Sequence, residues 1–206
     1  MDKDEIMTEI VTSYREYEED DDIVSFDISV EEPYNHYGER GVVDIYVDQT
    51  HSDGGDPDDY IFEMTSDATL DAVTGANEIL RQFQRMVKYF YEDDGHSFYH
   101  QDFRNPDRHP VSFCLVFAPT TRCVKHVFDN LELYAETAET TFLDSAAVKK
   151  RIGFYLDSGL GTKIAPLPVD SVNGNGFAHH THQDPQLRRA VKNADIDYEL
   201  PPRGDG

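Results

Sequence analysis

The stretch GVVDIYVDQTHSDGGDPDDYIFEMT, residues 41–65, indicates how this chain folds. Two runs rich in β-branched and aromatic residues, 41–47 and 60–65, flank a polar run that contains several turn-forming residues. This pattern predicts two strands of a hairpin joined by an exposed loop. Each predicted strand carries one acidic residue within its run, Asp44 in the first and Glu63 in the second.

On both sides of this hairpin the sequence alternates between helical and strand patterns. Apolar residues at helical spacing predict helices, and compact runs of strand formers predict strands. The expected helices cover residues 5–18, 75–91 and 145–150, with another that Thr120 or Thr121 caps and that continues through Tyr134. The expected strands cover residues 23–30, 111–117 and 152–156, and an extended segment covers 163–169. This alternation favours an α/β protein.

The length and hydrophobic content predict a single domain. With 206 residues, of which 38% are hydrophobic, the chain has enough apolar material for one sizeable core and little for a second. We expect this domain to cover residues 1–169. The apolar pattern fades beyond Asp170, so residues 170–206 are predicted to be a flexible C-terminal tail, with one short helix over 185–193 left open.

Acidic residues strongly outnumber basic ones. The chain has 41 Asp and Glu against 18 Lys and Arg, a formal net charge of −23. In dilute buffer these charges repel one another, whereas at 1 M ionic strength the Debye length falls to about 3 Å. The composition therefore predicts a halophilic, archaeal source and a solvated acidic surface. It does not exclude a nucleic-acid partner, but such a partner requires a local basic face.

Neither a membrane span nor a secretory signal is expected. No run of about 18 apolar residues is present, and the chain begins with the acidic sequence MDKDE, residues 1–5. Cys114 and Cys123 show no paired spacing. We therefore expect a cytoplasmic protein whose two thiols are buried and reduced.

The two strand acids suggest a metal site. Side chains two residues apart on a strand point the same way, so Glu63 and Thr65 share a face, and an adjacent strand can bring Asp44 alongside Glu63. Two neighbouring carboxylates repel each other unless a cation joins them, and Mg²⁺ or Mn²⁺ suits such a pair. A divalent ion held there can polarise a phosphate and activate water for phosphodiester hydrolysis.

Residues 41–44 (GVVD) and 63–65 (EMT), on successive strands between two helices, resemble the signature of the PD-(D/E)XK nuclease superfamily. The resemblance covers roughly residues 5–136 and implies a restriction-endonuclease-like core, a central mixed β-sheet flanked by helices. It also implies that Asp44 and Glu63 bind the metal, and that the following helix carries a glutamine near the site, here Gln82.

The third residue of the second motif departs from the family pattern. The resemblance implies a lysine that assists the attacking water, but this chain has Thr65. A hydroxyl cannot supply the positive charge that stabilises the transition state. The helix that follows offers Arg81, Arg85 and Lys88 as nucleic-acid contacts, and Lys88 as a distant substitute for the motif lysine. Pairing of these three cations with nearby acids is an equally good interpretation.

The first hypothesis is a Mg²⁺-dependent nuclease that cuts DNA in high salt, and a homodimer is left open. The alternative is a catalytically inactive nuclease-fold binding or assembly module, which Thr65 favours. An acidic DNA mimic is a third, weaker reading. The histidines are interpreted as a flexible tail (His179, His180, His182) and as weak general-base candidates (His96, His100, His109).

Overall fold

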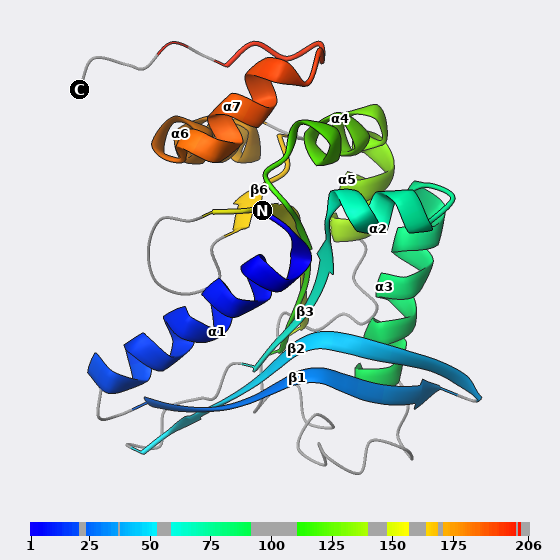
Figure 1. Cartoon of the computed structure of the whole chain (residues 1–206), viewed down its shortest axis with the longest axis vertical. Coiled ribbons are helices and arrows are strands. Elements are labelled where there is room, and N and C mark those ends of the chain that lie inside the picture. Colours follow the sequence, from blue (N-terminus) through cyan, green and yellow to red (C-terminus); the bar gives the residue numbers. More distant parts are fainter. Residues whose placement is uncertain are drawn as a thin grey trace.

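In this computed structural model, six strands form one sheet in chain order from β1 to β6 (Figure 1). The described residues are 1–20, 24–36, 38–52, 59–91, 111–139, 148–156, 164–168, 171–200 and 202. The β3–β4 and β4–β5 pairs are parallel and the other three pairs are antiparallel, so the sheet is mixed, as predicted. The strands are β1 (Val24–His36), β2 (Glu39–His51), β3 (Asp59–Thr65), β4 (Val111–Phe117), β5 (Val148–Tyr155) and β6 (Ile164–Pro166).

Helices lie on both sides of the sheet, which completes the predicted α/β architecture. Figure 1 shows α1 on one side and α3 on the other. On the α1 side, the Tyr14 ring lies 6.4 Å from the Phe62 ring of β3, measured between centroids. The helices are α1 (Lys3–Asp20), α2 (Asp67–Ala72), α3 (Ala76–Tyr91), α4 (Thr121–Asp129), α5 (Leu131–Glu139), α6 (Ser171–Gln183) and α7 (Pro185–Asn193).

The helical spacing of apolar residues explains which helix faces are buried. In α1, Ile6, Ile10 and Tyr14 follow at steps of four and are all buried. In α3 the buried residues include Ile79, Leu80, Phe83, Met86 and Val87. Both helices match their predicted positions closely and cover the sheet region that contains Asp44 and Glu63.

The predicted hairpin is confirmed, since β2 and β3 pair as antiparallel strands. Most of its loop, residues 53–58, lies outside the described residues. The β1 strand extends further than predicted, to His36, because it continues to pair with β2 up to His36↔Glu39. Pro33 is tolerated within β1 because this strand lies at the edge of the sheet.

Two predicted helices differ from the structure. Residues 148–150, predicted as the end of a helix over 145–150, belong to β5, because β4 offers this segment a complete parallel ladder from Val111↔Val148 onward. The helix expected from residue 120 through Tyr134 is two helices, α4 and α5, separated at Asn130. The Asn130 side chain donates a hydrogen bond to the His126 carbonyl (2.8 Å), and this local contact competes with a continuous helix.

The segment after Asp170 differs from the expected flexible tail. The predicted helix Pro185–Asn193 is present as α7, and α6 precedes it. Phe177 and Leu187 are fully buried, and the Phe177 ring lies 6.0 Å from that of Phe154 in β5. Asp184 caps α7 by accepting the Leu187 N–H at 2.8 Å. These widely spaced apolar residues give a weak sequence pattern, yet they extend the core.

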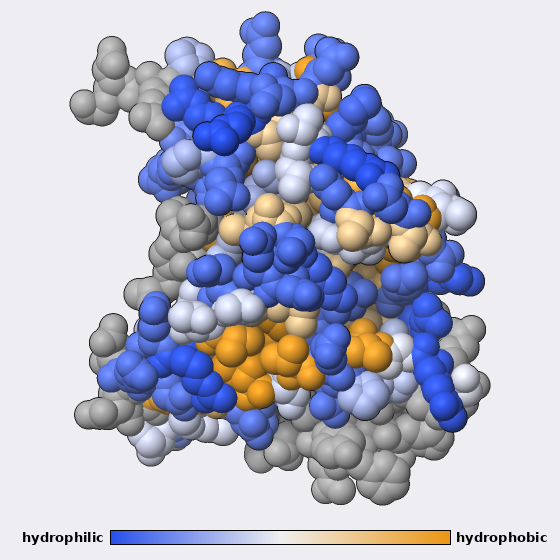
Figure 2. Space-filling model, in the orientation of Figure 1, coloured by the Kyte–Doolittle hydropathy of each residue, from blue (hydrophilic) through white to orange (hydrophobic). Residues whose placement is uncertain are grey.

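The surface is mainly hydrophilic, with one apolar region over β1 and β2 below α1 (Figure 2). Val30 of β1 and Val42 of β2 are exposed, at 49% and 48% of their surface. In the part of the chain that the structure describes, no helix has the length and hydropathy needed to cross a membrane. Cys114 and Cys123 are buried and free, as predicted.

Candidate functional site

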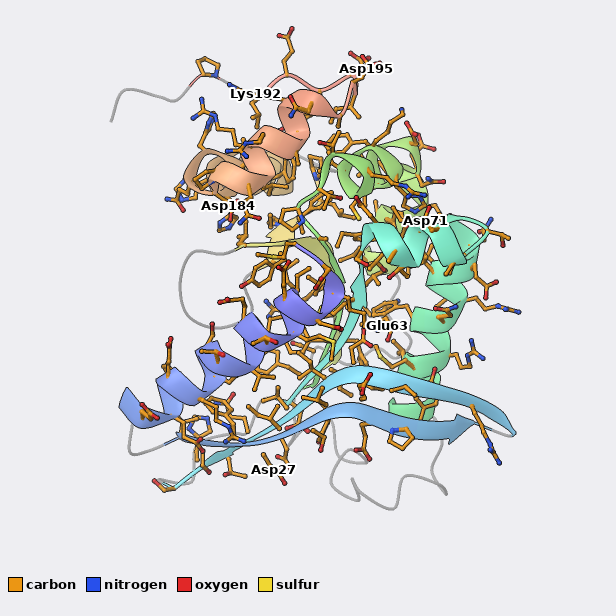
Figure 3. The ribbon with its side chains drawn as sticks, in the orientation of Figure 1. Asp27, Glu63, Asp71, Asp184, Lys192 and Asp195 are labelled. Carbon is orange, nitrogen blue, oxygen red and sulfur yellow. The ribbon has the colours of Figure 1, made fainter. Side chains whose placement is uncertain are left out.

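The two predicted metal ligands lie on adjacent strands and point the same way. The β2–β3 register runs from Val47↔Tyr60 to Ile45↔Phe62, so Asp44 and Glu63 are the next residues along the two strands, and the Asp44 charge acts on Glu63. Residues directly opposite in an antiparallel pair project from the same face. Figure 3 shows Glu63 between α1 and α3. The two carboxylates therefore form one site.

Asp44 is held in position by two donors. Its Oδ2 atom accepts the Met64 backbone N–H at 2.6 Å, and its Oδ1 atom lies 2.5 Å from the Lys3 ammonium nitrogen. The side chain is only 3% exposed. Burial raises the pKa of Asp44, whereas the Lys3 and Met64 contacts oppose this rise. Asp44 is thus a buried, oriented carboxylate rather than a solvated edge residue.

Glu63 has the most informative pKa in the site. Burial, followed by the charge of Asp44, raises the Glu63 pKa from 4.5 to about 8, against the opposing charges of Lys3 and Arg85. The side chain keeps partial contact with solvent, so water and ions can reach it. A carboxylic acid that holds its proton near neutral pH binds a divalent cation by releasing that proton.

Lys3 supplies a cation that no motif indicated. It lies in the first turn of α1, and its side chain is 37% exposed. Burial lowers the Lys3 pKa, but the contact with Asp44 and the charges of Asp44, Glu63 and Glu31 outweigh this effect and raise it. The Lys3 side chain therefore stays protonated beside both carboxylates.

A third acid, Glu31, lies across from Asp44 on the other neighbouring strand. The β1–β2 pairs Val30↔Ile45 and Glu32↔Val43 place Glu31 opposite Asp44. Glu31 is exposed and has a φ of 55°, in the left-handed region that non-glycine residues rarely adopt. Its charge adds to the rise in the Asp44 pKa. The edge strand is thus distorted next to the buried acid.

The predicted site residues of α3 have different partners in the structure. The positive charge of Arg85 opposes the rise in the Glu63 pKa. Arg81 instead donates to Glu78 at 2.8 Å, and Gln82 donates to the same carboxylate at 3.5 Å. The Lys88 side chain lies outside the described residues. Arg85 is thus the residue of this helix whose charge acts on Glu63.

Thr65, the residue at the motif-lysine position, is buried at the end of β3. The residue is 1% exposed, and its carbonyl accepts the Ala118 N–H at 2.9 Å. These contacts tie the end of β3 to the end of β4. Thr65 is therefore a buried residue at the junction of β3 and β4, and the positive charges that act on Glu63 come from Lys3 and Arg85.

The donor set fits a divalent ion that retains much of its water. Each carboxylate oxygen has more than one lone pair, so the existing contacts of Asp44 leave capacity for a metal bond. Among the described residues no group of three or more His, Cys, Asp or Glu could hold a metal. Two carboxylates plus water are typical of Mg²⁺ rather than of Zn²⁺.

Sequence reasoning missed Lys3 and Glu31. Lys3 is far from Asp44 in the chain, and the only signal was a single lysine within the acidic run MDKDE. Glu31 sits in the acidic EEP sequence of residues 31–33 and carries no motif. Both come near the site only through the packing of α1 and the register of β1.

Comparison with known proteins identifies one family. A family model described as a PD-(D/E)XK nuclease superfamily domain matches residues 1–195. No curated protein and no solved structure matches the chain. The matched range includes Lys3, the acid pair and the helices α6 and α7.

Proposed function

The chain belongs to the PD-(D/E)XK nuclease superfamily, and from this premise we propose that it hydrolyses DNA phosphodiester bonds with a divalent metal held by Asp44 and Glu63. Members of this superfamily typically use divalent metal ions. The observation that carries the proposal is Lys3, whose ammonium group lies 2.5 Å from Asp44 and raises the local positive charge where the motif lysine is missing. Magnesium or manganese is the expected cofactor.

Each residue of the site has a distinct chemical role in this proposal. A bound divalent ion supplies phosphate polarisation and a lower pKa for bound water. Asp44, oriented by Met64, presents one carboxylate to the ion, and Glu63 presents the other after it loses its proton. Lys3 donates hydrogen bonds toward the attacking water and the developing phosphorane charge.

Arg85 and Lys3 act on Glu63 from α3 and α1, which lie on opposite sides of the sheet in Figure 1. Both charges oppose the rise in the Glu63 pKa. They therefore make the ionised, metal-binding form accessible near pH 8 rather than at a higher pH. No contact with the acid pair is described for Arg81, Gln82 or Lys88. For these three residues we propose only contacts to DNA.

The proposal is tested with isosteric changes at the two acids. Asp44→Asn and Glu63→Gln are each expected to abolish Mg²⁺- or Mn²⁺-dependent nicking of supercoiled plasmid, because each replaces a metal-binding carboxylate by an amide. Glu132→Gln, which removes a charge from an exposed position of α5, is the matched control and should cut normally. Thermal unfolding of all three variants checks that they fold.

One observation favours the rival function, a binding module without catalysis. Both Asp44 oxygens already have partners, so the site is neutralised in part without a metal. If the wild-type protein cuts no DNA with any divalent metal from low to multi-molar KCl, the module is the correct reading and the nuclease proposal is wrong.

We also propose adaptation to high salt and a cytoplasmic location. The net charge of −23 supports the first, because screening at high ionic strength relieves the repulsion among surface carboxylates. Buried, free Cys114 and Cys123 support the second, since reducing conditions maintain such thiols.

A further inference from the structure

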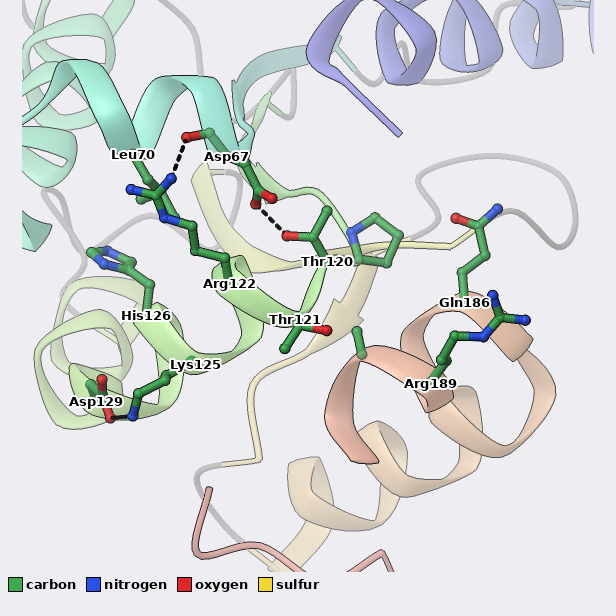
Figure 4. Close-up of a pocket in the computed structure, with 12 residues that line it drawn as sticks. Asp67, Leu70, Thr120, Thr121, Arg122, Lys125, His126, Asp129, Gln186 and Arg189 are labelled. Atoms are coloured by element: carbon green, nitrogen blue, oxygen red, sulfur yellow. Dashed lines mark hydrogen bonds and ion pairs between the residues drawn. The ribbon is translucent and has the colours of Figure 1, made fainter. Parts of the chain in front are cut away.

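A groove at the carboxyl ends of β3 and β4 gathers basic residues on a strongly acidic protein. It has a volume of about 990 Å³ and lies between α2 and α4 on one side and α7 on the other (Figure 4). Arg122 and Lys125 come from α4 and Arg189 from α7, against two acidic lining residues, Asp67 and Asp129. Three basic residues against two acidic ones make this groove less repulsive to a polyanion than the chain as a whole, whose net charge is −23.

The basic side chains of α4 are held by ion pairs whose carboxylate partners can be replaced. The Arg122 guanidinium lies 2.6 Å from Asp71, and the Lys125 ammonium lies 3.1 Å from Asp129. All four side chains are about half exposed or more, from 48% to 69%. Exposed ion pairs of this kind are worth about 0–1 kcal/mol, so a phosphate can replace the carboxylate partner at little cost.

Arg189 faces the groove from the other wall. It is exposed, and within the described part of the chain it has no ion pair. Gln186, one turn earlier on α7, also lines the groove and can donate hydrogen bonds. Figure 4 shows the Arg189 and Gln186 side chains across the groove from Thr121. The groove thus presents donors from two helices to one ligand.

The backbone at this edge adds to the attraction for anions. Thr120 caps the nine-residue helix α4 by accepting the Cys123 N–H at 3.1 Å, and Thr121 follows with an exposed side chain. The N-terminal end of a helix carries partial positive charge. In open α/β sheets, ligands bind outside the carboxyl ends of parallel strands, which is where the groove lies.

The groove is close to the acid pair along β3. Asp67 lines the groove only four residues after Glu63, so their Cα atoms are at most about 14 Å apart. In a DNA duplex each strand has one phosphate per 3.4 Å of helix axis. A strand cut at the acid pair can therefore extend into the groove over a few nucleotides.

We propose that this groove binds the phosphate backbone of the nucleic acid that flanks the scissile bond, through Arg122, Lys125 and Arg189. The proposal rests on the proposed nuclease function for the choice of ligand. It assigns the binding surface to α4 and α7, because their three basic residues line one groove, whereas Arg81 and Gln82 of α3 do not line it. No base-specific contact is part of the proposal, since phosphate contacts carry no sequence information.

The test measures DNA binding without cleavage. Binding of a fluorescent duplex is followed by anisotropy in EDTA, over a series of KCl concentrations, for wild type, Arg189→Ala, Lys125→Ala and the double variant. Each single change is expected to weaken binding about tenfold, the loss of one charge-assisted contact, and the double variant to flatten the salt slope by about 2. The matched control is Lys192→Ala, which removes a charge from an exposed position of α7 outside the groove.

The outcomes separate this proposal from the nuclease function. If Lys192→Ala weakens binding as much as Arg189→Ala, or if both groove variants bind DNA like wild type, the groove is not the phosphate contact. If inorganic phosphate binds the groove, with loss in Arg189→Ala, while DNA affinity is unchanged in that variant, a free anion is the ligand and the proposal is wrong. Binding that depends on the groove in a protein that never cuts DNA refutes only the nuclease function.

Discussion

The charged groups of two regions differ in their exposure to solvent. Those of the acid pair on β2 and β3 are largely buried, whereas those of the groove beside α4 and α7 are exposed. Asp44 is buried and has two short contacts, whereas Arg122 and Lys125 form ion pairs open to water. Burial raises the pKa values of Asp44 and Glu63, as is common for groups at functional sites. Exposure leaves the groove pairs weak and replaceable, which suits reversible binding. In the proposed function the acid pair is the rigid reaction site and the groove is the adaptable binding surface.

The largest effect on the cleavage rate is expected from substitution of Lys3, the cation beside the buried Asp44. Lys3→Met removes the one described cation in contact with Asp44, and we expect the cleavage rate to fall about 100-fold, as for loss of one preorganised donor. Lys3→Arg should restore part of the rate. The measurement is single-turnover cleavage of plasmid DNA, with Lys192→Met as the control for charge.

A Lys3→Met protein that cuts at the wild-type rate would restrict Lys3 to a structural partner of Asp44. The pH profile separates the two roles further. Loss of Lys3 removes a charge that lowers the Glu63 pKa, so the rising limb of the profile should move to higher pH.

A smaller effect is expected on the free energy of unfolding, which should depend on pH through the protonation of Glu63. Its pKa rises from 4.5 in the unfolded chain to about 8 in the folded protein, so between these values the folded state binds the extra proton. The free energy of unfolding therefore falls as pH increases through this window. Glu63→Gln should remove this fall, a gain on the order of 1–3 kcal/mol at pH 9 after solvent screening.

Urea unfolding at pH 6 and about pH 9 in EDTA measures this dependence. Mg²⁺ should stabilise wild type at the higher pH and leave Glu63→Gln unchanged, because only the ionised carboxylate binds the metal. Equal pH dependence in the two proteins would show that Glu63 is not the titrating group.

The smallest effect is expected on the pH midpoint of cleavage, when Arg85 and Arg81 of α3 are replaced in turn. Arg85→Ala removes a charge that lowers the Glu63 pKa, so the midpoint of the cleavage pH profile should rise by less than about one unit. Arg81→Ala should leave the midpoint in place, because Arg81 pairs with Glu78 at 2.8 Å and is 70% exposed. An equal shift in both variants would mean that net charge, rather than position, controls Glu63.

Several elements of this protein were predictable because their patterns are local. The periods of Ile6, Ile10 and Tyr14 in α1, and the two strand runs around the hairpin, appear in the structure much as predicted. The start of β5 was mispredicted as helix. Residues 148–150 form a parallel ladder with β4, and this pairing overrides their local helix preference. Helix α6, rich in Gly, Asn and His, has little pattern of its own and is stabilised by burial of Phe177.

By itself the amino-acid sequence determined the α/β class and the presence of one acid on each hairpin strand, since these depend on spacing of two to four residues. The mixed sheet was expected only from the resemblance to the nuclease superfamily. Only the tertiary structure decided that Lys3 reaches Asp44, that Glu31 lies opposite it, and that α7 closes a groove against α4. These contacts join residues far apart in the chain. Their formation depends on how whole helices pack on the sheet, which no local pattern encodes.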